Sequence, residues 1–150
     1  MNLNLSGLNL DKSIAVATSG GVDSLALCFL LKEQNIEFIS LIVDHKYRKD
    51  STEEAIAVKS LLNEHNIKSE ILTYKGKVPK KNIEKKLRKA RYSLLINFCK
   101  KNNINKLLTA HHLDDNIETF LMKLSKGSGI AGLSAIQPQT KIEDINIHRP

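Results

Sequence analysis

The chain has 150 residues, of which 41% are hydrophobic and 26% are charged, and its net charge at pH 7 is +7. This length and composition are typical of one globular domain, and the positive charge favours a polyanionic partner without identifying it. No apolar run approaches the roughly 20 residues of a membrane-spanning helix, and the first residues lack the features of a secretion signal, so we expect no membrane association. Two isolated cysteines, Cys28 and Cys99, argue against a disulfide scaffold and predict a reducing, cytoplasmic location.

The first predicted element is a strand over about residues 13–18, which leads into a glycine turn. The turn reads Ser19-Gly20-Gly21-Val22-Asp23-Ser24, and the dense apolar run behind it predicts a helix over about 23–34. Because the first N–H groups of a helix lack internal partners and carry a partial positive charge, this turn is typical of an anion site. A capped turn would also explain the glycines, but not Asp23, which would repel an anion unless a cation accompanied it.

A second strand is predicted over 36–43, and it closes at Asp44. Strand, turn, helix and strand within about thirty residues form a βαβ unit. Asp44 follows the glycine turn by about twenty residues, where many nucleotide-binding folds place an acid against a ribose or a base. A solvated acid at a strand end is the alternative, and His45 and Arg48 follow it.

The next helix is predicted to begin with a capping box, in which Ser51 is the N-cap and Glu54 lies three residues on. It runs to about residue 65, and a weaker strand over 67–74 and a basic loop over 75–81 follow. A longer helix then carries apolar residues at alternating steps of four and three: Ile83, Leu87, Ala90, Leu94 and Phe98. Its lysines predict a solvated face, whereas the planar guanidinium groups of Arg88 and Arg91 suit a phosphate.

A fourth strand over 104–110 ends in a cluster of two histidines and three acids within residues 111–118. A helix is predicted over about 115–126, so Asp115 and Glu118 would share one of its faces. Such side chains can bind a metal ion or a substrate, whereas the alternative, a simple helix cap, needs only one acid.

Strands that alternate with helices predict an α/β fold with a mostly parallel sheet flanked by helices. In such sheets ligands bind at the carboxyl ends of the strands. The polar clusters at 19–24, 44–45 and 111–115 follow strands one, two and four, so they are predicted to meet at one edge of the sheet. We expect the ligand site there.

The glycine turn lacks the lysine of the P-loop and the third glycine of the dinucleotide fingerprint, and it matches SGGxDS instead. That pattern is the pyrophosphate loop of the N-type ATP pyrophosphatases, the PP-loop superfamily. With the other motifs, in the same order from about residue 12, the chain resembles the tRNA(Ile)-lysidine synthetase family. The matching positions are 19–24, 43–45, Arg48, Asn82, 84–88, 91–92, 109–115, 118–119, 127–129, 132–133 and 149–150. Lys46, Leu87 and Lys126 depart from the family's usual residues.

The resemblance implies a Rossmann-like, adenine nucleotide alpha hydrolase-like fold and an ATP-dependent ligase that forms a carbon–nitrogen bond. The family joins L-lysine to carbon 2 of the wobble cytidine of isoleucine tRNA with anticodon CAU, forming lysidine. The tRNA is first adenylated with loss of pyrophosphate, and AMP leaves when lysine attacks. ATP and Mg²⁺ are the implied cofactors.

The same resemblance implies roles for individual residues. The turn (Ser19, Gly20, Gly21, Val22, Asp23 and Ser24) and Asp44 would bind ATP, with Asp23 facing Mg²⁺. Arg91 would stabilise charge that develops on the phosphate, and His111 would position ATP or the base. Asp115 and Glu118 would serve Mg²⁺ binding or lysine recognition, and the resemblance does not choose between these roles.

Members of the family continue beyond the Arg149-Pro150 pair into further domains that hold tRNA. Residues 1–150 therefore resemble the N-terminal catalytic domain, and we expect weak tRNA affinity for them. A PP-loop tRNA thiolase, a metal-dependent phosphohydrolase and a non-catalytic ATP-binding module are the alternatives; a thiolase would be expected to carry a CxxC pair, which Cys28 and Cys99 do not form. The oligomeric state is open, with a homodimer among the alternatives.

Overall fold

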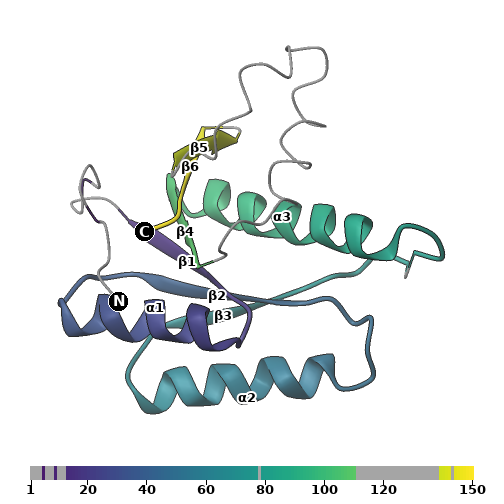
Figure 1. Cartoon of the computed structure of the whole chain (residues 1–150), viewed down its shortest axis with the longest axis horizontal. Coiled ribbons are helices and arrows are strands. Elements are labelled where there is room, and N and C mark those ends of the chain that lie inside the picture. The colour runs from purple at the N-terminus through teal and green to yellow at the C-terminus, as the bar shows by residue number, and fades with distance from the viewer. Residues whose placement is uncertain (1–4, 6–8, 10–12, 78, 111–138, 143) are drawn as a thin grey trace.

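The computed structural model describes residues 5, 9, 13–77, 79–110, 139–142 and 144–150. These residues form one six-stranded sheet, in the order β3-β2-β1-β4-β6-β5, and three helices that flank it (Figure 1). The strands are β1 Ile14–Thr18, β2 Ile39–Asp44, β3 Ser69–Thr73, β4 Lys106–Thr109, β5 Gln139–Ile142 and β6 Ile145–His148. The helices are α1 Val22–Glu33, α2 Ser51–Glu64 and α3 Ile83–Lys101. All strand pairs are parallel except β5 with β6, so the predicted mostly parallel α/β fold is confirmed.

The strand order reverses between β1 and β4. From β1 the chain steps outward to β2 and β3, and it then returns to add β4 on the other side of β1. Ala17 near the end of β1 lies in register with Thr109 at the end of β4. In open α/β sheets the ligand crevice lies at such a reversal, at the carboxyl ends of the strands. The glycine turn follows β1 at this point.

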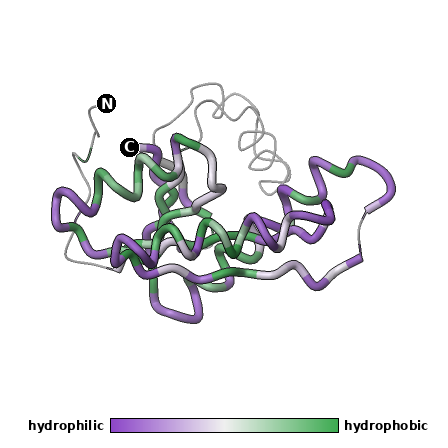
Figure 2. The backbone as a smooth tube through the Cα atoms, turned by 90° about the horizontal axis from the view of Figure 1, so that it is seen from below, coloured by the Kyte–Doolittle hydropathy of each residue, from purple (hydrophilic) through white to green (hydrophobic). Residues whose placement is uncertain are grey.

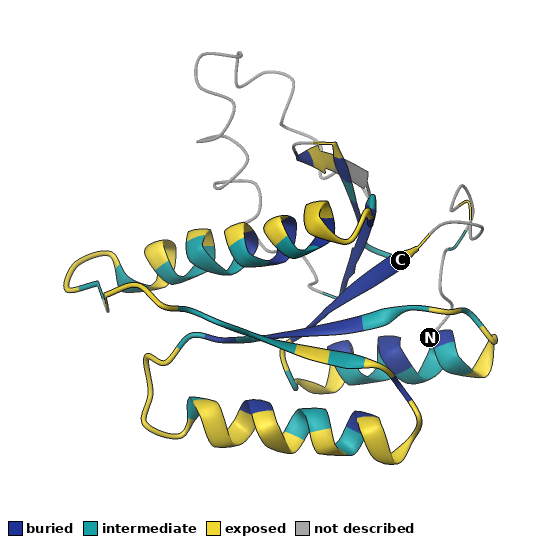
Figure 3. Ribbon diagram, turned by 180° about the vertical axis from the view of Figure 1, so that it is seen from behind, coloured by how far each residue is buried: buried dark blue, intermediate teal, exposed yellow. Residues whose placement is uncertain are grey.

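The helices cover both faces of the sheet, with α1 and α2 on one face and α3 on the other (Figure 1). Successive side chains of a strand point to opposite faces. Ile14 and Val16 of β1 accordingly pack with α1 and α2, whereas Ala15 and Ala17 pack with α3. Hydrophobic residues gather along the strands, and the strands are largely buried (Figures 2 and 3).

Each of the three described helices is followed, two residues beyond its last residue, by an asparagine in the left-handed conformation. These residues are Asn35, Asn66 and Asn103, with φ between 55° and 57°. The N–H of the following isoleucine donates to the carbonyl five residues back in every case, for example from Ile104 to Cys99 over 2.8 Å. This is the Schellman arrangement, which satisfies carbonyls that the helix end would otherwise leave unpaired. It also starts the chain back toward the next strand.

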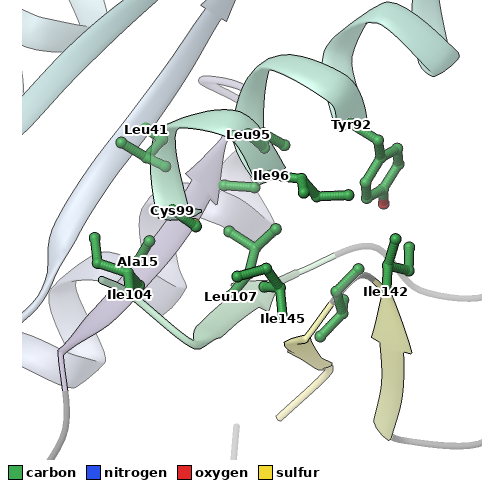
Figure 4. Packing of buried hydrophobic residues seen from close by; sticks show 12 residues of the cluster. Ala15, Leu41, Tyr92, Leu95, Ile96, Cys99, Ile104, Leu107, Ile142 and Ile145 are labelled. Carbon is green, nitrogen blue, oxygen red and sulfur yellow. The ribbon is translucent and has the colours of Figure 1, made fainter. Parts of the chain in front are cut away.

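The apolar face predicted for α3 is partly wrong. Its buried residues are Tyr92, Leu95, Ile96 and Cys99 (Figure 4). Leu94 and Phe98 of the predicted stripe lie at the margin of this face and are half-buried. The predicted stripe did not include Tyr92. In the fold Tyr92 is 1% exposed because it fills the space between α3 and the strands β5 and β6.

Two strands, β5 and β6, were not predicted. Each has four residues, and their sequences, QTKI and INIH, are too short to show a strand period clearly. β2 also begins three residues later than predicted, at Ile39, because residues 36–38 only connect α1 to the sheet. The other predicted strands and helices among the described residues are confirmed within three residues at each end.

Candidate functional site

A cleft of about 310 Å³ lies at the carboxyl ends of β1 and β2, between α2 and α3. Its walls are largely apolar, from strand residues 41–43 and from Ala55, Val58 and Leu87 on the helices. Polar side chains converge on it from four elements: Ser19, His45, Arg48, Ser51, Glu54 and Arg91. An apolar cleft with a few convergent polar groups is the usual form of a small-molecule site.

The glycine turn is fixed by hydrogen bonds that centre on Ser24. The Ser24 hydroxyl donates to the Gly21 carbonyl (3.0 Å) and accepts the Ser19 N–H (3.2 Å). The Ser19 hydroxyl in turn accepts the Gly21 N–H at 3.3 Å. Gly20 has φ +85°, a conformation that L side chains rarely adopt, and a Cβ there would lie 2.8 Å from a methyl carbon of Val58. The turn therefore requires glycine at position 20.

Helix α1 begins at this turn without a side-chain cap. Gly21 is its N-cap, and no side-chain hydrogen bond satisfies the first N–H groups of the helix among the described residues. Asp23 and Val22 in the first turn are exposed, Val22 to 84%. Unpaired N–H groups that point outward from an open turn bind anions, and the helix dipole favours the negative charge. The uncapped turn leaves room for an anion, and phosphate binding there stays a prediction.

Asp44 is held by three hydrogen bonds at the end of β2. Its Oδ1 accepts the Lys46 N–H (3.0 Å) and the Ser51 hydroxyl (2.9 Å), and its Oδ2 accepts the Thr52 hydroxyl (2.7 Å). The side chain is only 2% exposed. Burial opposes ionisation of the carboxyl, but the hydrogen bonds from Thr52, Ser51 and Lys46 outweigh it and lower the pKa of Asp44. Asp44 thus ties β2 to the start of α2 across the turn 45–50.

The predicted capping box at the start of α2 is wrong. Ser51 is the first residue of the helix, and its hydroxyl donates to Asp44 instead of capping the N–H of Glu54. That N–H donates to the Asp50 carbonyl over 2.9 Å. The Glu54 carboxylate accepts a hydrogen bond from Arg48 at 2.8 Å. Because Ser51 is already inside the helix and the Glu54 N–H bonds to Asp50, the Ser51 hydroxyl is not required as a cap and donates to the buried, charged Asp44 carboxylate.

The turn after Asp44 brings His45 and Arg48 into the cleft. His45 is half-buried, and its Nδ1 is shielded from solvent with no hydrogen-bond partner in the described part of the chain. Burial and the positive charge of Arg91 lower the pKa of His45, and Arg48 adds to this effect while Asp44 opposes it. Both effects favour the neutral imidazole, which has one nitrogen that can accept a hydrogen bond. The sequence motif contains His45 and Arg48, but no role was predicted for either.

Arg91 reaches the cleft from the other face of the sheet. It lies on α3 one turn beyond Leu87, and both residues line the cleft. The charged residues that line the cleft are Arg48, Glu54 and Arg91, and Arg48 pairs with Glu54, so the lining carries one net positive charge. The fork of a guanidinium group matches a phosphate. The structure thus brings Arg91, Ser19 and the turn after Asp44 to one site.

His111, Asp115 and Glu118 lie outside the described residues, as does the helix predicted over 115–126. The described strand leading to them ends at Thr109, which is 1% exposed. In the described ranges no three His, Cys, Asp or Glu side chains form a group that could hold a metal ion. Mg²⁺ needs only one or two carboxylates when substrate phosphates supply its other ligands, and the exposed Asp23 fits that requirement.

A second cavity, of about 640 Å³, lies at the opposite ends of the strands from the cleft. It is lined by residues around the amino ends of β1 and β2, among them Lys32, Asn35 and Asn66. The glycine turn and the polar groups described above are absent from its lining. Although this cavity is larger, it lies at the amino ends of the strands, where ligands rarely bind in α/β sheets.

Residues 3–150 match the family model described as the PP-loop domain. The chain belongs to the PP-loop domain family. Its curated relatives include proteins named tRNA(Ile)-lysidine synthase from Wolbachia pipientis wMel, Zymomonas mobilis and Chlamydia caviae. The identities are 43%, 38% and 36%, over 93%, 89% and 97% of this chain. The matched part amounts to 34%, 40% and 46% of these relatives, so the chain spans less than half of their length.

The fold is similar to that of a U34-tRNA thiolase from Methanococcus maripaludis, solved with its [4Fe-4S] cluster. The TM-score is 0.69 over 93% of this chain and 51% of the thiolase chain, at 20% sequence identity. This likeness confirms the PP-loop type of α/β fold. Among the described helices of this PP-loop domain, none combines the length and the apolar character needed to cross a bilayer.

Proposed function

We propose that this PP-loop domain is the ATP-binding catalytic part of a tRNA(Ile)-lysidine synthase. One observation carries the proposal: the open, uncapped start of α1 lies beside a cleft that also receives Arg48 and Arg91. An anionic ligand would be bound at one end by backbone N–H groups and at the other by guanidinium groups. The similarity to relatives named tRNA(Ile)-lysidine synthase supports the substrate.

In the proposed first step, the oxygen on carbon 2 of the wobble cytidine attacks the α-phosphorus of ATP. A phosphorus–oxygen bond forms to the base, the bond to the β-phosphate oxygen breaks, and pyrophosphate leaves. The glycine turn would bind the β- and γ-phosphates, because its N–H groups can stabilise the charge that grows on the leaving group. Arg91 would stabilise charge at the α-phosphate.

In the proposed second step, the amine of L-lysine attacks carbon 2 of the adenylated cytidine. A carbon–nitrogen bond forms, the carbon–oxygen bond to AMP breaks, and the amine loses a proton. We assign His111 to the positioning of ATP or the base, and Asp115 and Glu118 to Mg²⁺ or lysine recognition. These assignments follow the family resemblance and remain predictions.

Mg²⁺, held by the ATP phosphates and the Asp23 carboxylate, would neutralise phosphate charge when bound. The prediction that Asp44 contacts a ribose or base remains open. Its three hydrogen bonds support an additional, indirect role, since they fix the turn that carries His45 and Arg48. A cytoplasmic location is part of the proposal, because the substrate is a tRNA. A homodimer remains an untested alternative.

A tRNA thiolase is the second candidate, because the structural neighbour is one. Sulfur chemistry needs exposed or clustered thiolates. Cys28 on α1 and Cys99 on α3 are both buried, and they lie on opposite faces of the sheet. Burial raises the pKa of both thiols, that of Cys99 to about 11. The cysteines therefore favour the ligase over the thiolase.

Exchange of radiolabelled pyrophosphate into ATP, in the presence of isoleucine tRNA with anticodon CAU, tests the first step. We expect Arg91→Ala to slow the exchange about 100-fold, the loss typical when one charge-stabilising group is removed. Lys101→Ala is the matched control, because it removes one exposed positive charge from the same helix at a residue that does not line the cleft. Near-normal exchange in both Arg91→Ala and Asp115→Ala would contradict the assigned site.

A further inference from the structure

The positive charge of the chain is concentrated in one segment, residues 75–89. This basic segment contains eight lysines and arginines and a single acid, Glu84, so it carries +7. The whole chain also carries +7, which means that the other residues are neutral overall. If the lysine content reflected only a general preference for lysine, the positive charge would be distributed along the whole chain and not confined to one segment. The basic segment comprises the connection from β3 to α3 and the first two turns of α3.

The charges of the basic segment are available to a partner. Its seven lysines are exposed: Lys75, Lys77, Lys80, Lys81, Lys85, Lys86 and Lys89. The ion pairs found between described residues are formed elsewhere, by Arg48 with Glu54 and by Lys141 with Asp144. On α3, Lys85 and Lys89 are four residues apart and share a helix face, where like charges repel one another. Salt screens such repulsion only beyond the Debye length of about 8 Å. A polyanion would relieve this repulsion.

The basic segment adjoins the candidate active site. Leu87 and Arg91 of α3 line the cleft, whereas Lys85, Lys86 and Lys89 lie exposed on the same helix. At a rise of 1.5 Å per residue, Lys85 lies only about 9 Å along the helix axis from Arg91. The connection before α3 forms a hydrophilic end of the molecule (Figure 2). A nucleic acid with one base in the cleft would therefore pass its phosphates close to these lysines.

We propose that the basic segment is the surface on which this domain docks the phosphate backbone of its RNA substrate near the reacting base. The proposal rests on the proposed function, which supplies the RNA. A lipid surface fits less well, because membrane-bound helices present an apolar face. The apolar face of α3 is buried against the sheet, and the exposed large hydrophobic side chains in the described part of the chain, Val22, Tyr47 and Ile56, lie outside the segment.

The test is fluorescence anisotropy with a labelled anticodon stem-loop of isoleucine tRNA, titrated between about 50 and 200 mM salt. The docking variant is Lys80→Glu/Lys85→Glu/Lys89→Glu. The matched control is Lys59→Glu/Lys68→Glu/Lys101→Glu, which changes the net charge equally at residues outside the segment. We expect the docking variant to bind RNA at least tenfold more weakly and the control less than threefold. The slope of log affinity against log salt should fall by about two, since each phosphate contact to a single strand contributes about 0.7.

Equal loss of RNA affinity in the two variants would overturn the proposal, because it would show that only total charge matters. Equally tight binding of phosphatidylserine vesicles, with the same sensitivity to the docking substitutions, would also overturn it. The Lys→Gln versions of both variants repeat the comparison without charge reversal. ATP affinity, measured in the same proteins, should be unchanged in both. A wild-type chain that does not bind ATP would count against the proposed function and would leave the RNA comparison intact.

Discussion

Asp44→Asn is expected to destabilise the fold by about 2 kcal/mol and to weaken ATP binding at least tenfold. An amide in place of the carboxylate cannot accept all three hydrogen bonds, so the hydroxyl of Thr52 or Ser51 loses its acceptor. Losing a hydrogen bond to a buried charged group costs about 1–3 kcal/mol. The turn that carries His45 and Arg48 would loosen, and both residues line the cleft. Urea unfolding and calorimetric titration with ATP measure the two effects.

Asp50→Asn is the control for this substitution. It makes the same chemical change at an exposed residue next to α2, where the side chain forms no cap hydrogen bond. We expect it to change stability by less than about 0.5 kcal/mol, as is usual for surface positions. If the two variants unfold at the same urea concentration and bind ATP equally, Asp44 does not organise the site.

The stability that Asp44 provides should also depend on pH. In the folded protein, hydrogen bonds outweigh burial and lower the pKa of the Asp44 carboxyl below the ordinary value of about 3.9 for an aspartate. The unfolded state therefore binds a proton more readily as pH falls. The contribution is complete at neutral pH and is lost as pH falls below about 4. The difference in the free energy of unfolding between wild type and Asp44→Asn should therefore become smaller as the pH falls below about 4.

Gly20→Ala is the second substitution with a large expected effect. A residue with a side chain at φ +85° is strained by about 1–2 kcal/mol, and the new Cβ would lie 2.8 Å from a Val58 methyl carbon. We expect a loss of about 1–3 kcal/mol in the free energy of unfolding and at least tenfold weaker ATP binding, because the glycine turn must change shape. Urea unfolding and ATP titration again give both quantities.

Gly21→Ala provides the comparison for stability. A Cβ at Gly21 would lie 3.4 Å from the Ser19 hydroxyl oxygen, an ordinary contact, and the backbone there is extended. Its stability should stay within about 0.5 kcal/mol of wild type. In a Val58→Ala background, Gly20→Ala should cost less than in wild type by the part of the loss that the close contact causes. Equal stability of Gly20→Ala and Gly21→Ala would show that the turn does not have the conformation described.

The βαβ unit and the glycine turn could be predicted from the sequence because their determinants are local. An apolar run, two adjacent glycines and a second apolar run define β1, the turn and α1 within twenty residues. The location of the cleft at the carboxyl ends of the strands then followed from the topology of parallel sheets.

The surroundings of Asp44 could not be predicted, because they depend on a contact across a turn. Ser51 and Glu54 have the spacing of a capping box, but the buried carboxylate captures the Ser51 hydroxyl and Arg48 engages Glu54. The role of Tyr92 in the core was missed for a similar reason. Its burial depends on the short strands β5 and β6, which lie about fifty residues farther along the chain and have no clear periodicity of their own.

The most direct test of the account is an NMR titration of the labelled chain with Mg²⁺ and ATP, following backbone amide shifts. We expect saturable shifts at residues 19–24 and 45–48, which form the glycine turn and the turn fixed by Asp44. The larger cavity at the amino ends of the strands is the internal control, and the amide chemical shifts of Asn35 and Asn66 there should not change. Saturable shifts confined to that cavity, or no shifts in the glycine turn at millimolar ATP, would contradict the assignment of the cleft as the nucleotide site.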